Sequence, residues 1–256
     1  MQRSGWVSLL LGLLLLAAWE LAATGLKLST LVLPPPSMVM TALRHGFASG
    51  YLGPHVLQTL FEVALGFALG SLLGFLGGVA LGEWPAARRV LMPYLVVSQV
   101  VPKLALAPLL IVWLGFGATP TVVITALICF FPLLENTLTA MQHVAPQRLE
   151  LFRMLRASRW QTIWRLKVPD GKPAILAGLR VAVVLAWVGA VVGEFIGASH
   201  GLGALIIAAQ GSMDTPLMFA VLTVITVLGL TFYKACEWLE RRWLGTSSDF
   251  STRTTS

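Results

Sequence analysis

Six stretches of this 256-residue chain are long and apolar enough to cross a lipid bilayer, which takes about 20 residues of helix. A segment surrounded by hydrocarbon has to satisfy its own backbone hydrogen bonds, so each stretch is expected to be a helix. Only 11% of the residues are charged, against roughly 25% in a soluble domain. The sequence therefore predicts an all-α integral membrane protein with about six transmembrane helices, at residues 6–23, 59–81, 91–114, 119–140, 175–196 and 217–233.

The first stretch has to be distinguished from a secretory signal peptide. Its apolar run exceeds the roughly 7–15 residues of a signal-peptide core, and Arg3 is the one basic residue ahead of it. We therefore expect a retained helix, which forms an N-terminal unit with an external loop at residues 1–57. Residues 58–243 are then a core with five helices, and residues 244–256 a tail that is expected to be cytoplasmic and disordered.

Basic residues are concentrated in one internal segment, 146–173, which contains seven Arg and Lys but only Glu150 and Asp170 as acids. Short loops rich in Lys and Arg stay in the cytoplasm. This rule places 146–173 and both chain ends inside, and it leaves Lys27 and Arg44 in the external loops. Basic residues set between apolar spans favour cytoplasmic retention over nucleic-acid binding, in which such residues cover a soluble fold.

The basic segment has the pattern of two short helices. Pro146 suits the first turn of a helix, where its missing N–H would have no partner. Ser158 and Gln161 form an S-x-x-Q capping box that begins a second helix, after a sharp corner at Ala157 and Ser158. Pro169 is expected to end that helix, because the residue before a proline avoids the helical conformation. The pair either projects into the cytoplasm or lies flat on anionic lipid.

This segment resembles the EAA loop of ABC importer permeases, the inner-membrane components of binding-protein-dependent transport. The matching residues are Glu150 for the glutamate, Ala157 and Ser158 for Ala-Ser, and Val168 and Pro169 for the final Leu-Pro. Leu151 and Phe152 replace two alanines, and Arg156 replaces the glycine.

The resemblance covers about residues 33–243 and points to the nitrate, sulfonate and taurine branch. It is carried by Leu-Pro-Pro-Pro-Ser at 33–37, the Val-Pro-Lys-Leu-Ala motif at 101–105, Phe-Pro at 131–132 with Asn136, and Gly-Leu-Gly at 201–203. Glu62 departs from the branch, which usually has a basic residue at this position.

The resemblance implies a type I ABC importer permease fold with cytoplasmic coupling helices, in the bacterial inner membrane. It also implies a homodimer in membrane lipid, two copies of a separate ABC ATPase, and a periplasmic or lipid-anchored solute-binding protein. The solute would be nitrate, a sulfonate, taurine or a thiamine pyrimidine precursor. The residues expected to couple to the ATPase are Glu150, Arg153, Arg156, Ala157, Ser158, Trp160 and Trp164. The rival hypothesis is an ATP-independent secondary transporter, which often shows internal inverted repeats that this sequence lacks.

Ionisable residues inside the apolar stretches include Lys103, Glu194, Glu62 and Glu135, and such groups are costly there and usually face a protein interior or a water-filled path. Lys103 follows Pro102, which breaks the helix and frees backbone groups, so Lys103 either neutralises a passing anion or pairs with a carboxylate. Glu194 is expected to pair or to form a gate, whereas Glu62 and Glu135 are expected to reach water.

Glycines contribute two further patterns. Gly201 and Gly203 allow a tight turn, which is either a re-entrant gating loop, as the resemblance implies, or a plain external turn. The residues expected along the translocation path and gate are Pro102, Lys103, Asn136, Glu194, Gly201 and Gly203. Glycines also recur every four residues at 66, 70, 74 and 78, a spacing that lets another helix approach closely. Ser37 is expected to cap a surface helix at 38–47.

No catalytic, metal-binding or cofactor-binding pattern is visible. The four histidines form no metal pair, and no glycine-rich phosphate loop ends in Lys-Ser or Lys-Thr. Cys129 and Cys236 have the setting of small hydrophobic residues within helices. We therefore expect a transport subunit rather than an enzyme, with ATP hydrolysis on a separate subunit.

Overall fold

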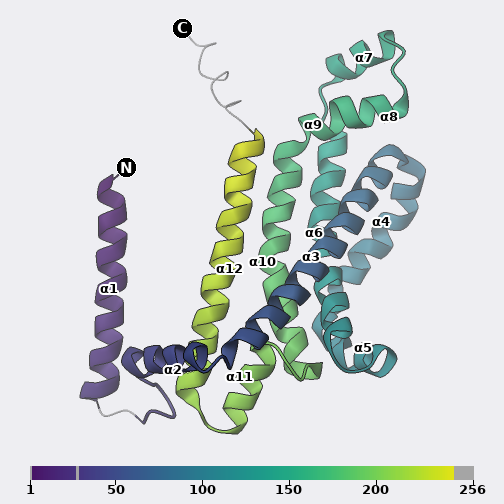
Figure 1. The fold of residues 1–256 in the computed structure, drawn as a ribbon. Helices are drawn as coiled ribbons and strands as arrows, with labels where there is room; N and C mark the ends of the chain where they lie inside the picture. The colour runs from purple at the N-terminus through teal and green to yellow at the C-terminus, as the bar shows by residue number, and fades with distance from the viewer. Residues whose placement is uncertain (1, 27–28, 245–256) are drawn as a thin grey trace.

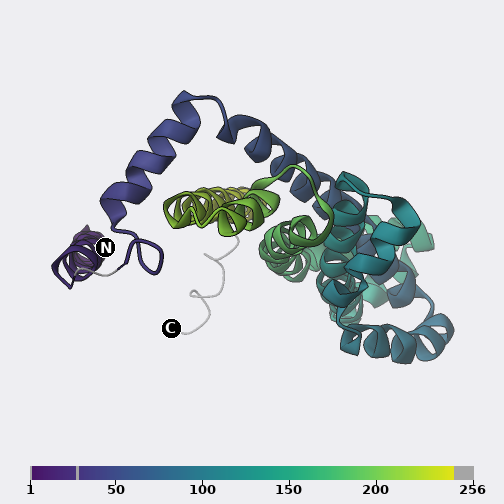
Figure 2. The ribbon, with the colours of Figure 1, turned by 90° about the horizontal axis from the view of Figure 1, so that it is seen from below.

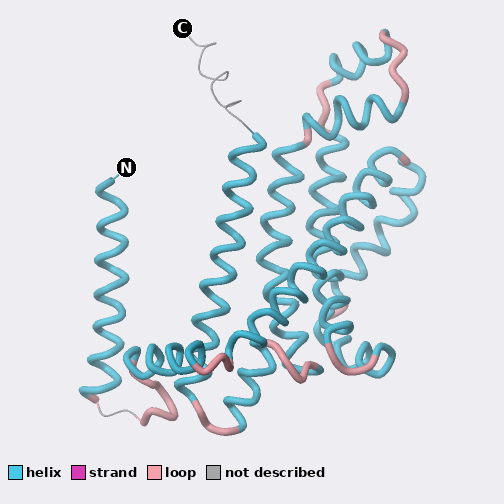
Figure 3. The backbone as a smooth tube through the Cα atoms, in the orientation of Figure 1, coloured by secondary structure: helices cyan, strands magenta, loops and turns pink. Residues whose placement is uncertain are grey.

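A computed structural model describes residues 2–26 and 29–244, and these residues form helices and connections with no strand among them (Figure 3). The predicted tail, beyond Leu244, lies outside the described residues. In chain order the helices are α1 Gln2–Gly25, α2 Pro36–Ala48, α3 Leu52–Glu83, α4 Pro85–Val100, η1 Lys103–Leu106, α5 Ala107–Leu114, α6 Ala118–Gln142, α7 Pro146–Met154, α8 Arg159–Thr162, η2 Ile163–Lys167, α9 Val168–Asp170, α10 Lys172–Gly197, α11 Leu202–Gly211 and α12 Thr215–Leu244.

The centre of the molecule is a bundle of α3, α6 and α10 (Figure 1). The glycines of α3 face α6 so closely that a Cβ at Gly66, Gly70, Gly74 or Gly78 would come within 3.0 Å of an atom of α6. On α10, Gly178 and Gly193 lie equally close to α6. The expected packing role of the glycine stripe is therefore confirmed, and the small residues explain how three helices pack so closely.

Four helices of the described chain are long and apolar enough to span a membrane, namely α3, α6, α10 and α12. The predicted third span is not straight, since α4 and the η1–α5 segment meet at an angle of 81°. Val101 and Pro102 are extended at this break, with ψ of 122° and 95°. The proline removes one backbone donor, and the chain turns instead of continuing the helix. The first predicted span falls on α1.

The two ends of the bundle are named here by the helices they carry. The α8 end carries α7, α8 and α9, and the α11 end carries α2 and α11. Figure 1 shows the start of α1 and the end of α12 pointing toward the α8 end. Figures 1 and 2 both place α1 apart from the central bundle, with α2 between them.

The surface helix near residue 38 is present as α2, but Ser37 is not its cap. The N-cap residue is Pro35 and makes no side-chain cap bond. Ser37 instead donates its hydroxyl to Glu20 Oε1 at 2.8 Å and its backbone N–H to Oε2 at 3.0 Å, which joins α2 to α1. A carboxylate from another helix thus replaces the local cap.

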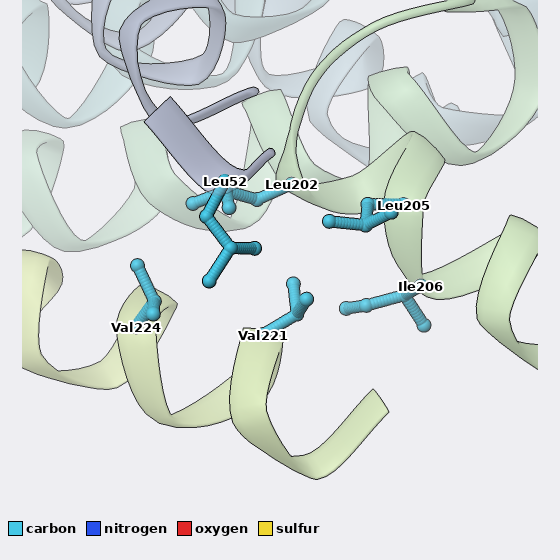
Figure 4. Packing of buried hydrophobic residues seen from close by; sticks show 6 residues of the cluster. All are labelled: Leu52, Leu202, Leu205, Ile206, Val221 and Val224. Carbon is cyan, nitrogen blue, oxygen red and sulfur yellow. The ribbon is translucent and has the colours of Figure 1, made fainter. Parts of the chain in front are cut away.

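The short helix α11 is held between the beginnings of α3 and α12 (Figure 4). Leu202, Leu205 and Ile206 of α11 pack against Leu52 of α3 and against Val221 and Val224 of α12. Because Leu52, Leu202 and Val221 are completely buried, α11 is anchored by apolar packing rather than left as a free loop.

Candidate functional site

The basic segment forms an elbow, by which we mean α7, α8 and the corner at residues 155–158 between them. Pro146 stands in the first turn of α7, as expected. Ser158 caps α8 through a complete capping box, because its Oγ accepts the Gln161 N–H while Gln161 Oε1 accepts the Ser158 N–H. The predicted helix pair and its corner are therefore confirmed.

Arg156 stands at the turning point of the elbow with a φ of +50°. The Ala157 N–H donates to the Phe152 carbonyl at 3.0 Å, and the Arg156 N–H donates to the Arg153 carbonyl at 3.0 Å. These two bonds form the Schellman motif, whose left-handed position is usually occupied by glycine. The replacement of a glycine by Arg156 therefore keeps the left-handed turn, at the expense of steric strain at its Cβ.

The prediction that Pro169 ends the second helix is wrong. The chain passes from α8 into the π-helical turn η2, where the Val168 N–H donates to the Ile163 carbonyl five residues back, and then into α9. The wider turn places Pro169 at the start of a new helical segment, where its missing N–H costs nothing. After α9, Gly171 packs against Ala140 and leads directly into α10.

Two ion pairs stabilise the elbow and the segment that joins it to the bundle. Lys167 Nζ bonds to Glu83 Oε1 at the end of α3, and only 15% and 18% of these two side chains is exposed. Arg148 of α7 bonds to Asp170 of α9 at 2.5 Å, and 61% of the Arg148 side chain is exposed. The partly buried first pair makes a firmer link than the second, since exposed pairs contribute little.

The residues predicted to couple to an ATPase lie together on the elbow. They are exposed except for Ala157, which is half-buried, and they comprise Glu150, Arg153, Arg156, Ala157, Ser158, Trp160 and Trp164. Trp160 and Trp164 also border an apolar groove of about 250 Å³ near the end of α3. Phe75 and Trp84 line the same groove. The elbow thus presents cations and aromatic rings to a partner.

The break before η1 is a second candidate region. Lys103 is half-buried, and its Nζ donates to Gln99 Oε1 of α4 at 2.7 Å. None of the described carboxylates forms an ion pair with it. The side chain is therefore held by a neutral amide.

A third region lies at the α11 end, where Glu194 of α10 meets the start of α11. Glu194 Oε1 accepts the Thr59 hydroxyl at 2.6 Å, and Oε2 accepts the Gly203 N–H at 2.5 Å. Gly201 has a φ of +126°, and a Cβ there would collide with the Glu194 carboxylate. Glu194, Gly201 and Gly203 come together here at the turn between α10 and α11, and the choice between a re-entrant gating loop and a plain external turn stays a prediction.

Other members of this third region were missed or misjudged from the sequence. Glu62 does not reach water as expected, because it is fully buried beside Glu194. His55 and Thr59 were missed: Gly201 N–H donates to His55 Nδ1 at 3.1 Å, and Leu202 N–H donates to Thr59 Oγ1 at 2.8 Å. The available signal was a polar face at residues 55, 58, 59 and 62, whose spacing places all four on one side of α3.

Asn136 lies away from both the break and the α11 end. Its Nδ2 donates to the Pro132 carbonyl at 2.8 Å, and its Cβ lies against Gly178 where α6 crosses α10. The predicted path residues thus fall into three places: the break, the α11 end and this crossing.

Comparison with known proteins identifies relatives of the whole chain. Residues 66–245 match the family of binding-protein-dependent transport system inner membrane components. The riboflavin transport system permease protein of Chloroflexus aurantiacus is 36% identical, with 95% of this chain and 93% of the relative covered. The formylaminopyrimidine transport permease protein of Halalkalibacterium halodurans is 34% identical (89% and 90%), and the taurine transport system permease protein of Escherichia coli is 32% identical (89% and 85%).

Among solved structures, an inward-facing form of the MetNI methionine ABC transporter is similar. The TM-score is 0.65, with 19% identity, and the likeness covers 75% of this chain and 95% of that chain. This likeness extends to the fold and supports the type I importer permease architecture expected from the sequence.

Proposed function

Since the chain belongs to the family of binding-protein-dependent transport inner-membrane components, we propose that its elbow receives an ATPase and that its opposite end receives the solute. The chain is the membrane-spanning permease subunit of an ATP-driven ABC importer, a transport protein whose ATP is hydrolysed by a separate subunit. Family membership also implies a solute-binding protein as partner and excludes the alternative of an ATP-independent carrier.

The α8 end faces the cytoplasm in this proposal. The exposed Arg and Lys of the elbow support it, because basic residues near transmembrane helices are retained inside. The start of α1 and the end of α12 both point toward the α8 end (Figure 1), so both chain termini are cytoplasmic in this proposal. The opposite, α11 end then faces the solute-binding protein.

The observation that carries the coupling role is the mechanical continuity of the elbow. A capping box and a Schellman motif define the two short helices, and the Lys167–Glu83 pair connects them to α3. Displacement of the elbow by an ATPase would therefore move α3 and α10 as rigid elements. Exposed Glu150, Arg153 and Trp160 would make the contact.

A second copy of the chain covers the α4–α5 face, and the path runs along this two-fold interface. Support comes from a row of large apolar side chains that the single chain leaves exposed, including Val97, Val100, Val112 and Phe116 at 64%, 82%, 79% and 84%. The break at Pro102 and Lys103 lies between these helices, so it would line the path. Glu194, Gly201 and Gly203 would form the gate at the outer end.

The solute is a small nitrogen- or sulfur-containing organic molecule. This part of the proposal rests on the relatives, whose names specify riboflavin, formylaminopyrimidine, aliphatic sulfonates and taurine.

Cysteine crosslinking tests the coupling role. In a variant whose Cys129 and Cys236 are replaced by Ala, Ser158→Cys should crosslink to the co-expressed ATPase, and the yield should change on addition of ATP. Arg44→Cys, an exposed position on α2 at the opposite end, is the matched control and should not crosslink. Absence of a crosslink from both Ser158→Cys and Ala157→Cys would contradict the proposal.

Labelling with a membrane-impermeant maleimide tests the orientation with the same two variants. Arg44→Cys should react in cells whose outer membrane is permeabilised, whereas Ser158→Cys should react only in inverted inner-membrane vesicles. The reverse pattern would show that the α8 end faces outward.

A further inference from the structure

Two buried carboxyl groups lie side by side at the α11 end without a basic partner. Glu62 is 0% exposed and Glu194 is 1% exposed, and Thr59, which lies one turn before Glu62 on α3, bonds to Glu194 Oε1. Among the described residues, no Lys or Arg forms an ion pair with either of them. Buried carboxyl groups without a basic partner depend on hydrogen-bond donors, so this arrangement favours a donor or a positive charge beside them.

The surroundings of the two groups differ. Both oxygens of Glu194 are occupied, by the Thr59 hydroxyl and the N-terminal N–H groups of α11. An N–H group in the first turn of a helix has no partner within that helix, and for Gly203 a side chain of α10 supplies the acceptor. Its role in the fold is to hold α11 in place.

Glu62 has spare hydrogen-bonding capacity. Its Oε1 accepts the Gln58 side-chain N–H at 2.7 Å, but its Oε2 is buried and has no hydrogen-bond partner. A buried acceptor without a partner costs about as much as a lost hydrogen bond, which makes it a place where an incoming donor is stabilised.

A small pocket adjoins Glu62 and leads to the surface. Its volume is about 90 Å³, and Gln58 and Glu62 line it on the α3 side. Gly117, Ala118 and Ala198 leave space because their side chains are small or absent, and exposed Ser199 and His200 stand at its edge. This volume accommodates a group of a few heavy atoms rather than a whole cofactor.

We propose that this pocket binds a positively charged or N–H-donating group of the transported solute, with Glu62 as the acceptor. The inference rests on the proposed function, because it places the pocket at the outer end of the path. It narrows the solute class, because the free Oε2 of Glu62 can accept a hydrogen bond from an amine, an aminopyrimidine or the ammonium end of a zwitterion. Nitrate and alkyl sulfonates have no N–H group to donate. A metal ion is a weaker fit, since the described residues contain no group of three His, Cys, Asp or Glu side chains arranged to hold one.

Ligand-dependent stability of the intact transporter tests the pocket. The full-length permease with its ATPase in nanodiscs would be heated with methylammonium chloride or 4-aminopyrimidine, against sodium chloride of equal ionic strength. At ligand concentrations about ten times the dissociation constant, the unfolding midpoint of the permease should rise by about 2–4 °C. Sodium methanesulfonate should produce no rise.

The matched variants are Glu62→Gln and Glu135→Gln. Glutamine keeps the shape of Glu62 but removes its charge, so the ligand-induced rise should disappear while the protein stays folded. Glu135 is an exposed carboxylate on α6, and its replacement should leave the rise unchanged. A rise that persists in Glu62→Gln, an equal rise with methanesulfonate, or no rise with either N–H donor in the wild-type protein would overturn the proposal.

A proton could be the sole occupant, and the same samples distinguish this case. If neither ligand has an effect, but lowering the pH from 8 to 6 stabilises the wild-type protein and not Glu62→Gln, the pocket holds only a proton and the proposal is wrong. The quantity to compare is the difference between the two proteins, because it cancels the contributions of other groups. Co-purification with the ATPase is scored separately, so failure of the importer assignment is not confused with failure of the pocket.

Discussion

The α8 end and the α11 end of this permease use charged residues in opposite ways. At the α8 end the charges are exposed or half-exposed and pair across the surface, as Arg148 and Asp170 do. At the α11 end Glu62 and Glu194 are buried with backbone and side-chain donors around them. An exposed charge loses little hydration and can exchange partners, whereas a buried one depends on each bond it keeps. The comparison predicts that the α8 end is a surface suited to a partner that moves, and that the turn at the α11 end is rigid.

The largest effect is expected from Glu194→Ala at the α11 end. The substitution leaves the Gly203 N–H without an acceptor, leaves the Thr59 hydroxyl only the longer bond to the His55 carbonyl, and opens a buried cavity. It should therefore destabilise the protein by about 3 kcal/mol. The unfolding midpoint of the purified permease measures this. Glu135→Ala, at an exposed site, should change stability by less than about 0.5 kcal/mol. Equal losses of stability in the two variants would contradict the expected difference between buried and exposed carboxylates.

Lys167→Met should have an intermediate effect, because the Lys167–Glu83 pair is only partly exposed. Loss of the ammonium leaves Glu83 unpaired and should cost about 2 kcal/mol. If the pair connects the elbow to α3, the variant should also hydrolyse ATP with weaker stimulation by the loaded solute-binding protein. The exchanged pair Glu83→Lys with Lys167→Glu should restore both properties, and failure to restore coupling alone would limit the pair to a structural role.

Arg156→Gly is expected to stabilise the elbow. Glycine adopts the +50° φ without a Cβ penalty, so the gain should be about 1 kcal/mol. Arg153→Gly, within the helical part of α7, is the contrasting control and should lose about 1 kcal/mol. Helix protection by hydrogen exchange at residues 147–157 measures both, and a loss in Arg156→Gly would mean that the guanidinium makes a compensating contact.

The smallest effect should come from Arg148→Ala. The Arg148–Asp170 pair is largely exposed, so removing it should cost about 0.5 kcal/mol at low salt and less at high salt. A thermal unfolding series in sodium chloride measures the difference. A cost comparable with that of Glu194→Ala would mean that the α8 end is as rigidly held as the α11 end.

Much of the fold could be predicted because its signals are local. The length of the apolar stretches predicted the spans, and the four-residue spacing of glycines predicted the close contact of α3 with another helix, which is α6. Ser158 and Gln161 predicted the start of α8. Each of these depends on residues within one or two helical turns. The Pro169 prediction was wrong because a π-helical turn upstream changed the register of the backbone bonds.

The site was harder to predict because its partners are distant in the chain. Glu62 was expected to reach water from its position near a helix end, but its environment is decided by Glu194 and by Gly117 and Ser199. The same holds for Thr59, whose hydroxyl bonds to Glu194, 135 residues away. The roles of Lys103 and Asn136 in the path remain predictions.

The π-helical turn Ile163–Lys167 has a consequence for the direction in which the elbow points. A π-helical turn contains one residue more than an α-helical turn, and each residue of a helix corresponds to about 100° of rotation about its axis. Deleting one residue there would let α8 and α9 join as regular α-helix, with no change in net charge if Ile163 were the residue removed. It would also swing the cationic face of the elbow by about a quarter turn relative to α10. The number of residues in this segment thus sets the direction in which the elbow points relative to the bundle. Loss of one residue would leave the bundle intact but turn the elbow away from the ATPase.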